Sequence, residues 1–336
     1  MPRPTIKDIS RIAGVSPTAV SFALNNRPGV SESTRARVLQ VAQEIGWHRS
    51  VAAAALSAGR AQAVGMVLPR PTGESTGERF LMHLIAGIEE VLTAHGLALV
   101  LQFIVSPEEE LETYRRWHFE RRVDGVILTD PVMDDPRPAI LEELTMPAVL
   151  IGSLPGNELP NVRVDDAAAM RFIVGHLAAQ GHRRVTHIPA PTNLIHTLKR
   201  SAAFAESCRE LGIETLRSET NPGTINAGQA ITHQLLMADN PPTAIIYDNE
   251  GLMLGGLGAI NAMGVRIPDD VAIVSFEDSA LCRVTSPPIT SLAYDPAGLG
   301  AEATTLLLDL LGGEEPREVV VAAPTIQVRG STQTRS

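Results

Sequence analysis

Residues 5 to 25 read Thr-Ile-Lys-Asp-Ile-Ser-Arg-Ile-Ala-Gly-Val-Ser-Pro-Thr-Ala-Val-Ser-Phe-Ala-Leu-Asn, and this stretch predicts two short helices joined by a tight turn. Thr5 is suited to cap the first helix, because its hydroxyl can accept a hydrogen bond from a free backbone amide. Gly14 ends that helix, since the turn needs a residue that tolerates a positive φ. Ser16 caps the second helix and Pro17 takes its first turn. The pattern indicates a helix-turn-helix, whose second helix enters a major groove.

The spacing of apolar residues assigns an inner and an outer face to each helix. The stripe expected to face inward on the first helix consists of Ile6, Ile9, Ile12 and Ala13. On the second helix, Val20 and Leu24 are expected to face inward. Its outward face then carries Pro17, Thr18, Ser21 and Phe22.

A third helix completes a small bundle. It is expected to begin at Ser31 or Ser33 and to end before Gly46. Its apolar stripe follows the i, i+3, i+4, i+7 spacing of a helix and consists of Val38, Val41, Ala42 and Ile45. We expect residues 1–49 to form one DNA-binding domain.

Residues 50–60 form an alanine-rich segment, Ser-Val-Ala-Ala-Ala-Ala-Leu-Ser-Ala-Gly-Arg. Alanine favours helix, but so short a segment is not stable as an isolated helix. Two interpretations stay open: a hinge helix that forms only when something holds it, and a plain linker. Leu56 is the one large apolar side chain of this segment.

The charge distribution separates the two ends of the chain. Residues 1–60 hold eight Lys and Arg against three Asp and Glu, a net charge of +5. Because the whole chain has a net charge of −10, residues 61–336 carry −15. A basic head on an acidic body binds phosphate locally while the body stays away from the duplex. This arrangement predicts double-stranded DNA as a partner of the head.

The composition of the chain argues against a membrane protein and against a secreted protein. The 336 residues are enough for two or three domains, and 44% of them are hydrophobic. No apolar run reaches the roughly 18 residues that a membrane span needs, and the N-terminus has no apolar signal region. Cys208 and Cys282 are expected to be free thiols in a reducing cytosol, so we expect a cytoplasmic protein with no membrane partner.

From residue 61 onward, apolar strands alternate with helices. The expected strands are 63–69, 97–103, 123–129, 148–151, 184–188, 244–247 and 271–276. The expected helices are 79–94, 107–120, 167–180, 196–211, 227–237, 250–263 and 297–311. This is an α/β pattern with parallel sheets covered on both faces, in which ligands gather at the carboxyl ends of the strands.

Two Pro/Gly-rich stretches, 154–160 and 286–288, indicate domain boundaries. They divide the core into two similar lobes joined by about three crossings of the chain. The first lobe is expected at about 61–158 and 291–322, and the second at about 161–288 and 323–330.

The chain resembles the lactose-repressor/galactose-repressor family of regulators along nearly its whole length. The motifs near the N-terminus are Thr5-Ile6-Lys7-Asp8-Ile9, Ala13-Gly14-Val15-Ser16, Val20-Ser21, Leu24-Asn25, Val30-Ser31, Thr34-Arg35 and Ala52–Leu56. Those in the body are Arg122-Val123-Asp124-Gly125, Gly181-His182-Arg183-Arg184, Pro242-Thr243-Ala244-Ile245, Asn249, Ile267-Pro268-Asp269-Asp270-Val271 and Pro287-Pro288-Ile289-Thr290. The resemblance implies a headpiece, a hinge helix and a two-lobed periplasmic-binding-protein-like core. It also implies a homodimer on a near-palindromic operator, and allosteric control by a small effector such as a sugar or nucleoside.

The resemblance also implies DNA contacts, by matching positions. They are Thr5, Ser16, Pro17, Thr18, Ser21, Phe22, Asn25, Ser31 and Thr34 in the headpiece, with Ala53 and Leu56 in the hinge. Leu56 matches a leucine that enters the minor groove. Phe22 departs from the arginine of many members: an arginine could read guanine, whereas phenylalanine can only touch a thymine methyl or pack. Ser50 likewise replaces a common asparagine.

In the effector cleft, Arg200 matches the arginine that binds ligand hydroxyls, and its planar fork of donors suits a vicinal diol or a carboxylate. Asn249 matches a ligand-binding asparagine and is also suited to cap a helix. Glu277 stands where many members have aspartate. Tyr294 could stack on a sugar face or pack at a crossing, and His196 lies four residues before Arg200 on one helix face. Weaker candidates from the first lobe are Arg70 and Phe80.

Catalysis is not expected from this sequence. It lacks the nucleophile elbow, the P-loop, the H-E-x-x-H motif and paired C-x-x-C motifs, and Gly255-Gly256-Leu257-Gly258 falls within a helix. We therefore expect no catalytic residue, no metal site and no cofactor. Two alternatives are a sugar receptor without gene control and a cytosolic sugar enzyme with a vestigial DNA domain.

Overall fold

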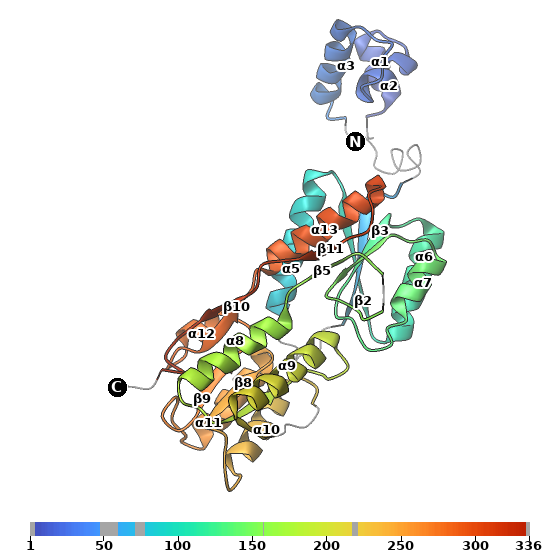
Figure 1. Ribbon diagram of the computed structural model, residues 1–336. Helices are drawn as coiled ribbons and strands as arrows, with labels where there is room; N and C mark the ends of the chain where they lie inside the picture. The colour runs from blue at the N-terminus through green and yellow to red at the C-terminus, as the bar shows by residue number, and fades with distance from the viewer. Residues whose placement is uncertain (1–3, 48–59, 71–77, 157, 217–220, 334–336) are drawn as a thin grey trace. The chain divides into compact units, whose positions relative to one another are not determined.

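The structure is a computed structural model, which describes residues 4–47, 60–70, 78–156, 158–216 and 221–333 (Figure 1). The chain divides into two compact units, residues 1–61 and residues 62–336. The hinge expected at 50–60, with Ala53 and Leu56, lies almost wholly outside the described residues.

The first unit is a three-helix bundle of α1 (Ile6–Ala13), α2 (Pro17–Leu24) and α3 (Glu32–Glu44). Thr5 and Asp8 form the expected capping box, and Gly14 follows α1 with a φ of 68°. Ser16 caps α2, and Ser31 rather than Ser33 caps α3. The buried core consists of Ile9, Ala13, Val20, Ala23, Val38, Val41 and Ala42.

The expected stripe of α1 is wrong at two of its four positions. Ile9 and Ala13 are fully buried, but Ile6 and Ile12 are 38% and 43% exposed. Ile6 and Ile12 lie to either side of Ile9 around the helix, and a bundle of such short helices covers only the narrow strip between them.

The second unit contains two mostly parallel sheets, each with six strands. The first sheet has the order β11 (Glu318–Val320), β5 (Asn161–Arg163), β4 (Ala148–Ile151), β3 (Gly125–Leu128), β1 (Ala63–Pro69) and β2 (Ala98–Ile104). The second has the order β12 (Thr325–Gln327), β10 (Thr290–Ala293), β9 (Ala272–Ser275), β8 (Ala244–Tyr247), β6 (Arg184–Ile188) and β7 (Glu214–Thr215). Of the pairings, that of β10 with β12 is antiparallel, and the others are parallel.

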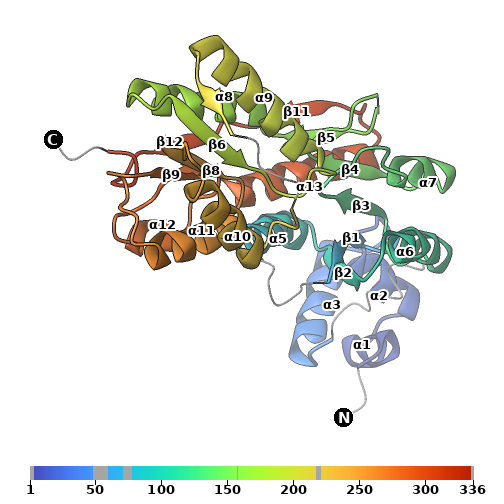
Figure 2. The same ribbon diagram turned by 90° about the horizontal axis from the view of Figure 1, so that it is seen from below.

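Helices cover both faces of each sheet, as continuous apolar strands require. The first sheet lies between α5 (Glu78–Ala94) with α13 (Pro296–Gly312) and α6 (Pro107–Glu120) with α7 (Arg137–Glu143) (Figure 1). The second lies between α8 (Asp166–Ala179) with α9 (Ile195–Leu211) and a group made of α10 (Ile225–Leu236), α11 (Glu250–Ala262) and α12 (Ala280–Val284) (Figure 2).

Glycines let two helix pairs approach closely. A Cβ at Gly255 would lie 1.9 Å from the Ile225 carbonyl oxygen, and one at Gly87 would lie 1.9 Å from the Ala297 carbonyl oxygen. Gly255 thus serves the contact of α11 with α10, while Gly256 makes room for the Tyr247 ring of β8. The glycine-rich run 255–258 lies inside a helix, as predicted.

The chain crosses between the lobes three times, but two crossings come later than expected. Asn161–Arg163 pair with β4 of the first sheet, and Thr290–Ala293 pair with β9 of the second. After each Pro/Gly-rich stretch the chain thus returns to the sheet that it has just left. Local turn residues mark such a loop without showing which sheet receives the next strand.

Both cysteines are buried free thiols, as expected. Among the described helices, none is long and apolar enough to cross a membrane.

Candidate effector site and nucleic-acid interface

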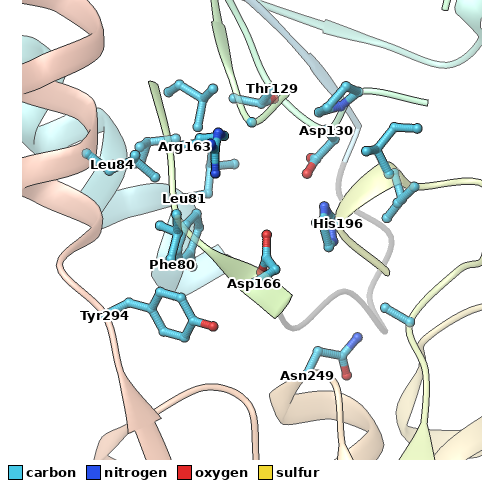
Figure 3. A pocket seen from close by; sticks show the side chains of 18 of the residues that line it. Phe80, Leu81, Leu84, Thr129, Asp130, Arg163, Asp166, His196, Asn249 and Tyr294 are labelled. Atoms are coloured by element: carbon cyan, nitrogen blue, oxygen red, sulfur yellow. The ribbon is translucent and has the colours of Figure 1, made fainter. Parts of the chain in front are cut away.

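A cavity of about 390 Å³ lies between the two lobes, where strands of both sheets end (Figure 3). All seven residues predicted for effector binding line it: Arg70, Phe80, His196, Arg200, Asn249, Glu277 and Tyr294. They come from six places in the fold. Arg70 follows β1, Phe80 is in α5, and both His196 and Arg200 are in α9. Asn249 caps α11, Glu277 lies just beyond β9, and Tyr294 directly follows β10. The fold thus brings together residues that are up to 224 positions apart, from Arg70 to Tyr294.

Arg200 is held by two carboxylates. Its Nε donates to Asp166 Oδ1 at 2.8 Å, and its Nη1 donates to Asp248 Oδ1 at 3.4 Å. Its guanidinium carbon lies 4.0 Å from the centre of the Phe276 ring, a cation–π arrangement. Burial alone lowers the pKa of Arg200, but Asp166 and Asp248 outweigh it and raise that pKa. Arg200 therefore stays charged in one fixed orientation.

Asp248 is the most deeply buried acid of the cavity, with a side chain that is 0% exposed. Its Oδ1 also lies 3.2 Å from His187 Nε2, and its Oδ2 accepts the Ala190 amide at 3.0 Å. Burial tends to raise the pKa of Asp248, but Arg200 and His187 hold it well below its usual range. The carboxylate is thus charged and fully occupied by protein groups.

Asn249 performs the capping role that its position suggested. Its Oδ1 accepts the Leu252 amide at 2.8 Å, and its Nδ2 donates to the Gly223 carbonyl at 3.0 Å. The side chain also lines the cavity. These bonds fix its orientation at the start of α11.

The floor of the cavity contains two buried polar groups, the Glu277 carboxyl and the Tyr294 hydroxyl. Glu277 Oε2 accepts the Glu250 amide at 3.2 Å, and burial raises the pKa of Glu277 to about 7. The Tyr294 hydroxyl is buried and has no hydrogen-bond partner among the described residues. It points into the cavity (Figure 3), while the ring lies 6.1 Å from that of Phe276. Tyr294 thus packs at the crossing and still offers its hydroxyl to a ligand.

His196 lies in the wall of the cavity and faces Asp130 of the first lobe (Figure 3). Burial lowers the pKa of His196, and the nearby Arg200 lowers it further. Beside it, backbone hydrogen bonds join the lobes: the Met133 amide donates to Asn193 at 3.2 Å and the Ile195 amide donates to Pro131 at 2.9 Å. His196 therefore stands at a contact between lobes.

The sequence analysis missed several polar residues of the cavity. They are Asp130, Ser153, Arg163, Asp166, Lys199 and Asp248. Asp248 follows β8 directly, and the carboxyl end of a parallel strand is where a ligand-site residue is expected. Asp166 gives no such signal, because it follows the first crossing and stands at the start of a helix.

The headpiece residues predicted to contact DNA lie at the starts of helices, along α2 or at its end. Thr5, Ser16 and Ser31 are caps, and Asn25 ends α2 with its Nδ2 donating to the Ser21 carbonyl at 2.8 Å. Thr34 Oγ1 lies 2.9 Å from Ser31 Oγ. Each helix start presents free amides that suit phosphate.

The exposed face of α2 differs from the expected one. Pro17 and Thr18 are exposed, whereas Ser21 and Phe22 are partly buried. The Phe22 ring packs against Gly29, where an added Cβ would meet it at 3.0 Å. Phe22 is therefore only partly outward, because an aromatic ring gains by covering the loop before α3.

Comparisons with known proteins match both units. "Bacterial regulatory proteins, lacI family" matches residues 5–50, and "Periplasmic binding protein-like domain" matches residues 174–332. The HTH-type transcriptional regulator AglR of Rhizobium meliloti is 30% identical over 338 residues, with 97% of this chain and 94% of the relative covered.

Solved structures agree. A LacI family transcriptional regulator from Bifidobacterium animalis is 31% identical, with a TM-score of 0.75 over 81% of this chain and 98% of that chain. The complex of transcriptional regulator CelR with cellobiose is 27% identical, with a TM-score of 0.72 over 98% of this chain and 100% of that chain.

The likeness to AglR extends along nearly the whole of both chains, so it includes the DNA-binding unit, the core and their order. The chain therefore belongs to the LacI family, and it is a DNA-binding transcriptional regulator controlled by a small-molecule effector.

Proposed function

We propose that this regulator is a repressor whose affinity for a near-palindromic operator is set by a carbohydrate bound between the lobes. The observation that carries the proposal is the convergence of all seven predicted residues on one cavity. We further propose that the cavity binds its ligand without turnover, so that its task is control rather than catalysis.

The lining of the cavity suits a carbohydrate. Arg200 and the unpartnered Tyr294 hydroxyl can bind hydroxyl groups, while Phe80, Leu81 and Leu84 offer an apolar wall. Sugars present this combination of polar edges and apolar faces. CelR, which covers this chain almost completely, was solved with the disaccharide cellobiose.

Control requires that the ligand favour one arrangement of the lobes over another. Both lobes line the cavity: Asp130 belongs to the first lobe and His196 to the second. A ligand bound there changes the relative free energies of open and closed lobes. We propose that this difference reaches the DNA through the chain segment at 50–60, which connects the DNA-binding unit to the core.

We propose that the operator is bound by a homodimer. β2 is an edge strand of the first sheet and carries Leu101 and Phe103, which are 39% and 38% exposed. Val105, just beyond it, is 77% exposed. An apolar edge strand is a surface that a second copy of the chain can cover.

Selection of bound duplexes from a random pool tests the DNA-binding part of the proposal. The protein is expected to enrich one near-palindromic sequence, with an affinity that falls steeply as salt rises because phosphate contacts dominate. Thr18→Ala should change the preferred half-site, since Thr18 is exposed on α2. Gln43→Ala, an exposed position near the end of α3, is the control and should not. A protein that enriches no sequence over random DNA would contradict the proposal.

A further inference from the structure

An antiparallel β-bridge joins the two lobes beside the cavity. It pairs Val132, in the loop after β3, with Leu194, in the loop before α9. The two backbone hydrogen bonds of this bridge are donated by the Met133 and Ile195 amides. The lobes cannot separate on this side of the cavity without breaking both bonds.

The bridge also completes the start of α9. Ile195 is the first residue of this helix, and Leu194 before it provides no side-chain cap. The first amides of a helix have no partner within the helix, so the Ile195 amide depends on the Pro131 carbonyl of the other lobe. If the bridge opens, that amide is left to water.

A buried ion cluster fixes the first-lobe half of the bridge. Arg137, at the start of α7, is 9% exposed, and the side chain of its partner Asp135 is 2% exposed. Arg137 Nη2 donates to Asp135 Oδ2 at 2.7 Å and to the Asp130 carbonyl at 3.2 Å. Asp135 Oδ2 also accepts the Val132 amide at 3.4 Å. The cluster thus bonds the backbone on both sides of Pro131, whose carbonyl belongs to the bridge.

Two side chains of α6 complete this cluster. Arg137 Nη1 donates to Glu110 Oε1 at 3.3 Å, and the Tyr114 hydroxyl donates to the same oxygen at 2.6 Å. Burial alone lowers the pKa of Arg137, but Asp135 and Glu110 outweigh it and raise that pKa. One charged guanidinium therefore links α6 with the start of α7, which lies beside it (Figure 1), and with the loop after β3.

The conformation of this loop explains why it has to be held. Asp130 and Asp134 have φ values of 50° and 53°, in the left-handed region that side chains other than glycine adopt reluctantly. Such a backbone persists where its surroundings fix it. A buried ion pair is often no more stabilising than apolar residues of the same volume, but its directional hydrogen bonds can fix a backbone, which an apolar contact cannot.

We propose that Arg137 is a positioning residue for the contact between the lobes. It holds residues 130–132 in the conformation that pairs with α9, and so stabilises the bridged arrangement of the lobes before any ligand binds. Arg137 lies outside the lining of the cavity, so its effect on the lobes does not require a ligand contact. The inference concerns the ligand-free protein, and only its consequence for operator affinity rests on the proposed function.

Hydrogen exchange at single amides of the full-length, ligand-free protein tests this role. In Arg137→Met, the Met133 and Ile195 amides should exchange at least about tenfold faster than in the natural protein, because the bridge opens more often. Ile195 is the decisive amide, since it belongs to the second lobe and reports the bridge rather than the loop. Its rate should rise more than the rates of the β8 amides, which exchange when the second lobe itself unfolds.

A conservative variant keeps the test valid if Arg137→Met does not fold. Arg137→Lys retains the positive charge beside Asp135 and Glu110, so the cluster keeps its charge balance. A single ammonium cannot reach both carboxylates and the Asp130 carbonyl together, because it lacks the planar fork of arginine. Exchange at Ile195 should therefore rise in Arg137→Lys as well, by a smaller factor than in Arg137→Met.

The matched control is Arg115→Met, on α6. Arg115 pairs with Glu112 at 2.7 Å, and both side chains are exposed. This substitution removes the same kind of side chain and ion pair from the same helix, but from its surface. It should leave the exchange of the Met133 and Ile195 amides unchanged.

The outcomes separate the inference from the proposed function. If the Ile195 rate is unchanged in the Arg137 variants that fold, or rises only as much as the rates in β8, the positioning role is overturned and effector control stands. Faster exchange confined to the bridge supports the role. Operator affinity of the same ligand-free variants should then differ from that of the natural protein. An equal affinity beside an opened bridge would leave the positioning role standing and contradict the proposed link from the lobes to DNA.

Discussion

Arg200→Ala is expected to abolish the effect of the ligand on operator affinity while operator binding itself persists. The substitution removes the principal donor of the cavity, whereas the DNA-binding unit is a separate compact unit of the chain. Coupling between two sites is commonly worth about 1–3 kcal/mol, or 5- to 150-fold in affinity. That factor should fall to about one. Because coupling is reciprocal, the operator should also cease to alter ligand affinity.

The same substitution should lower the free energy of unfolding of the core. It leaves Asp248, with a fully buried side chain, without its cation, and breaking a buried pair from one side costs about 3–5 kcal/mol. The double variant Arg200→Met, Asp248→Asn removes both charges and should recover much of this loss without recovering the ligand response. Urea unfolding measures the first effect, and operator titration with and without ligand measures the second. A full ligand response in Arg200→Ala would refute the role of Arg200.

The Glu277 carboxyl should make the core less stable as the pH rises from about 4.5 to about 7. Its pKa is raised from 4.5 to about 7 by burial, so in this range the folded state binds more protons than the unfolded state. The stability contribution is therefore complete below pH 4.5, is lost as the pH rises through 7, and is constant above that. Allowing for solvent in the cleft, the loss is on the order of 2 kcal/mol.

Glu277→Gln should remove this part of the pH dependence, because an amide does not titrate. The variant should match the natural protein near pH 5 and exceed it in melting temperature at pH 8. Glu250, Arg200 and Asp248 act on Glu277 electrostatically, and they are unchanged in this comparison. Glu214→Gln, at an exposed strand position, is the control and should leave the pH profile unchanged. Identical pH profiles for Glu277→Gln and the natural protein would contradict the raised pKa.

Local signals in the sequence determined the elements and the class of the protein. The caps Thr5 and Ser16, the left-handed Gly14 and the apolar strands act through neighbours in the chain, so a linear reading contains their physics. The seven predicted cavity residues came instead from the resemblance to the family, and all seven line the cavity. The headpiece stripe was less well determined, since the exposure of Ile6 and Ile12 depends on how the three helices meet.

Only the tertiary structure decided where the crossings lie and which charges meet. Whether Asn161–Arg163 join β4 depends on a free sheet edge, which no local pattern in those residues records. Arg200 meets Asp166 and Asp248 from 34 and 48 positions away. Because the energy of a buried ion depends on distance and desolvation rather than on sequence separation, this ion-pair cluster arises only when α8, α9 and the end of β8 pack together in the second lobe.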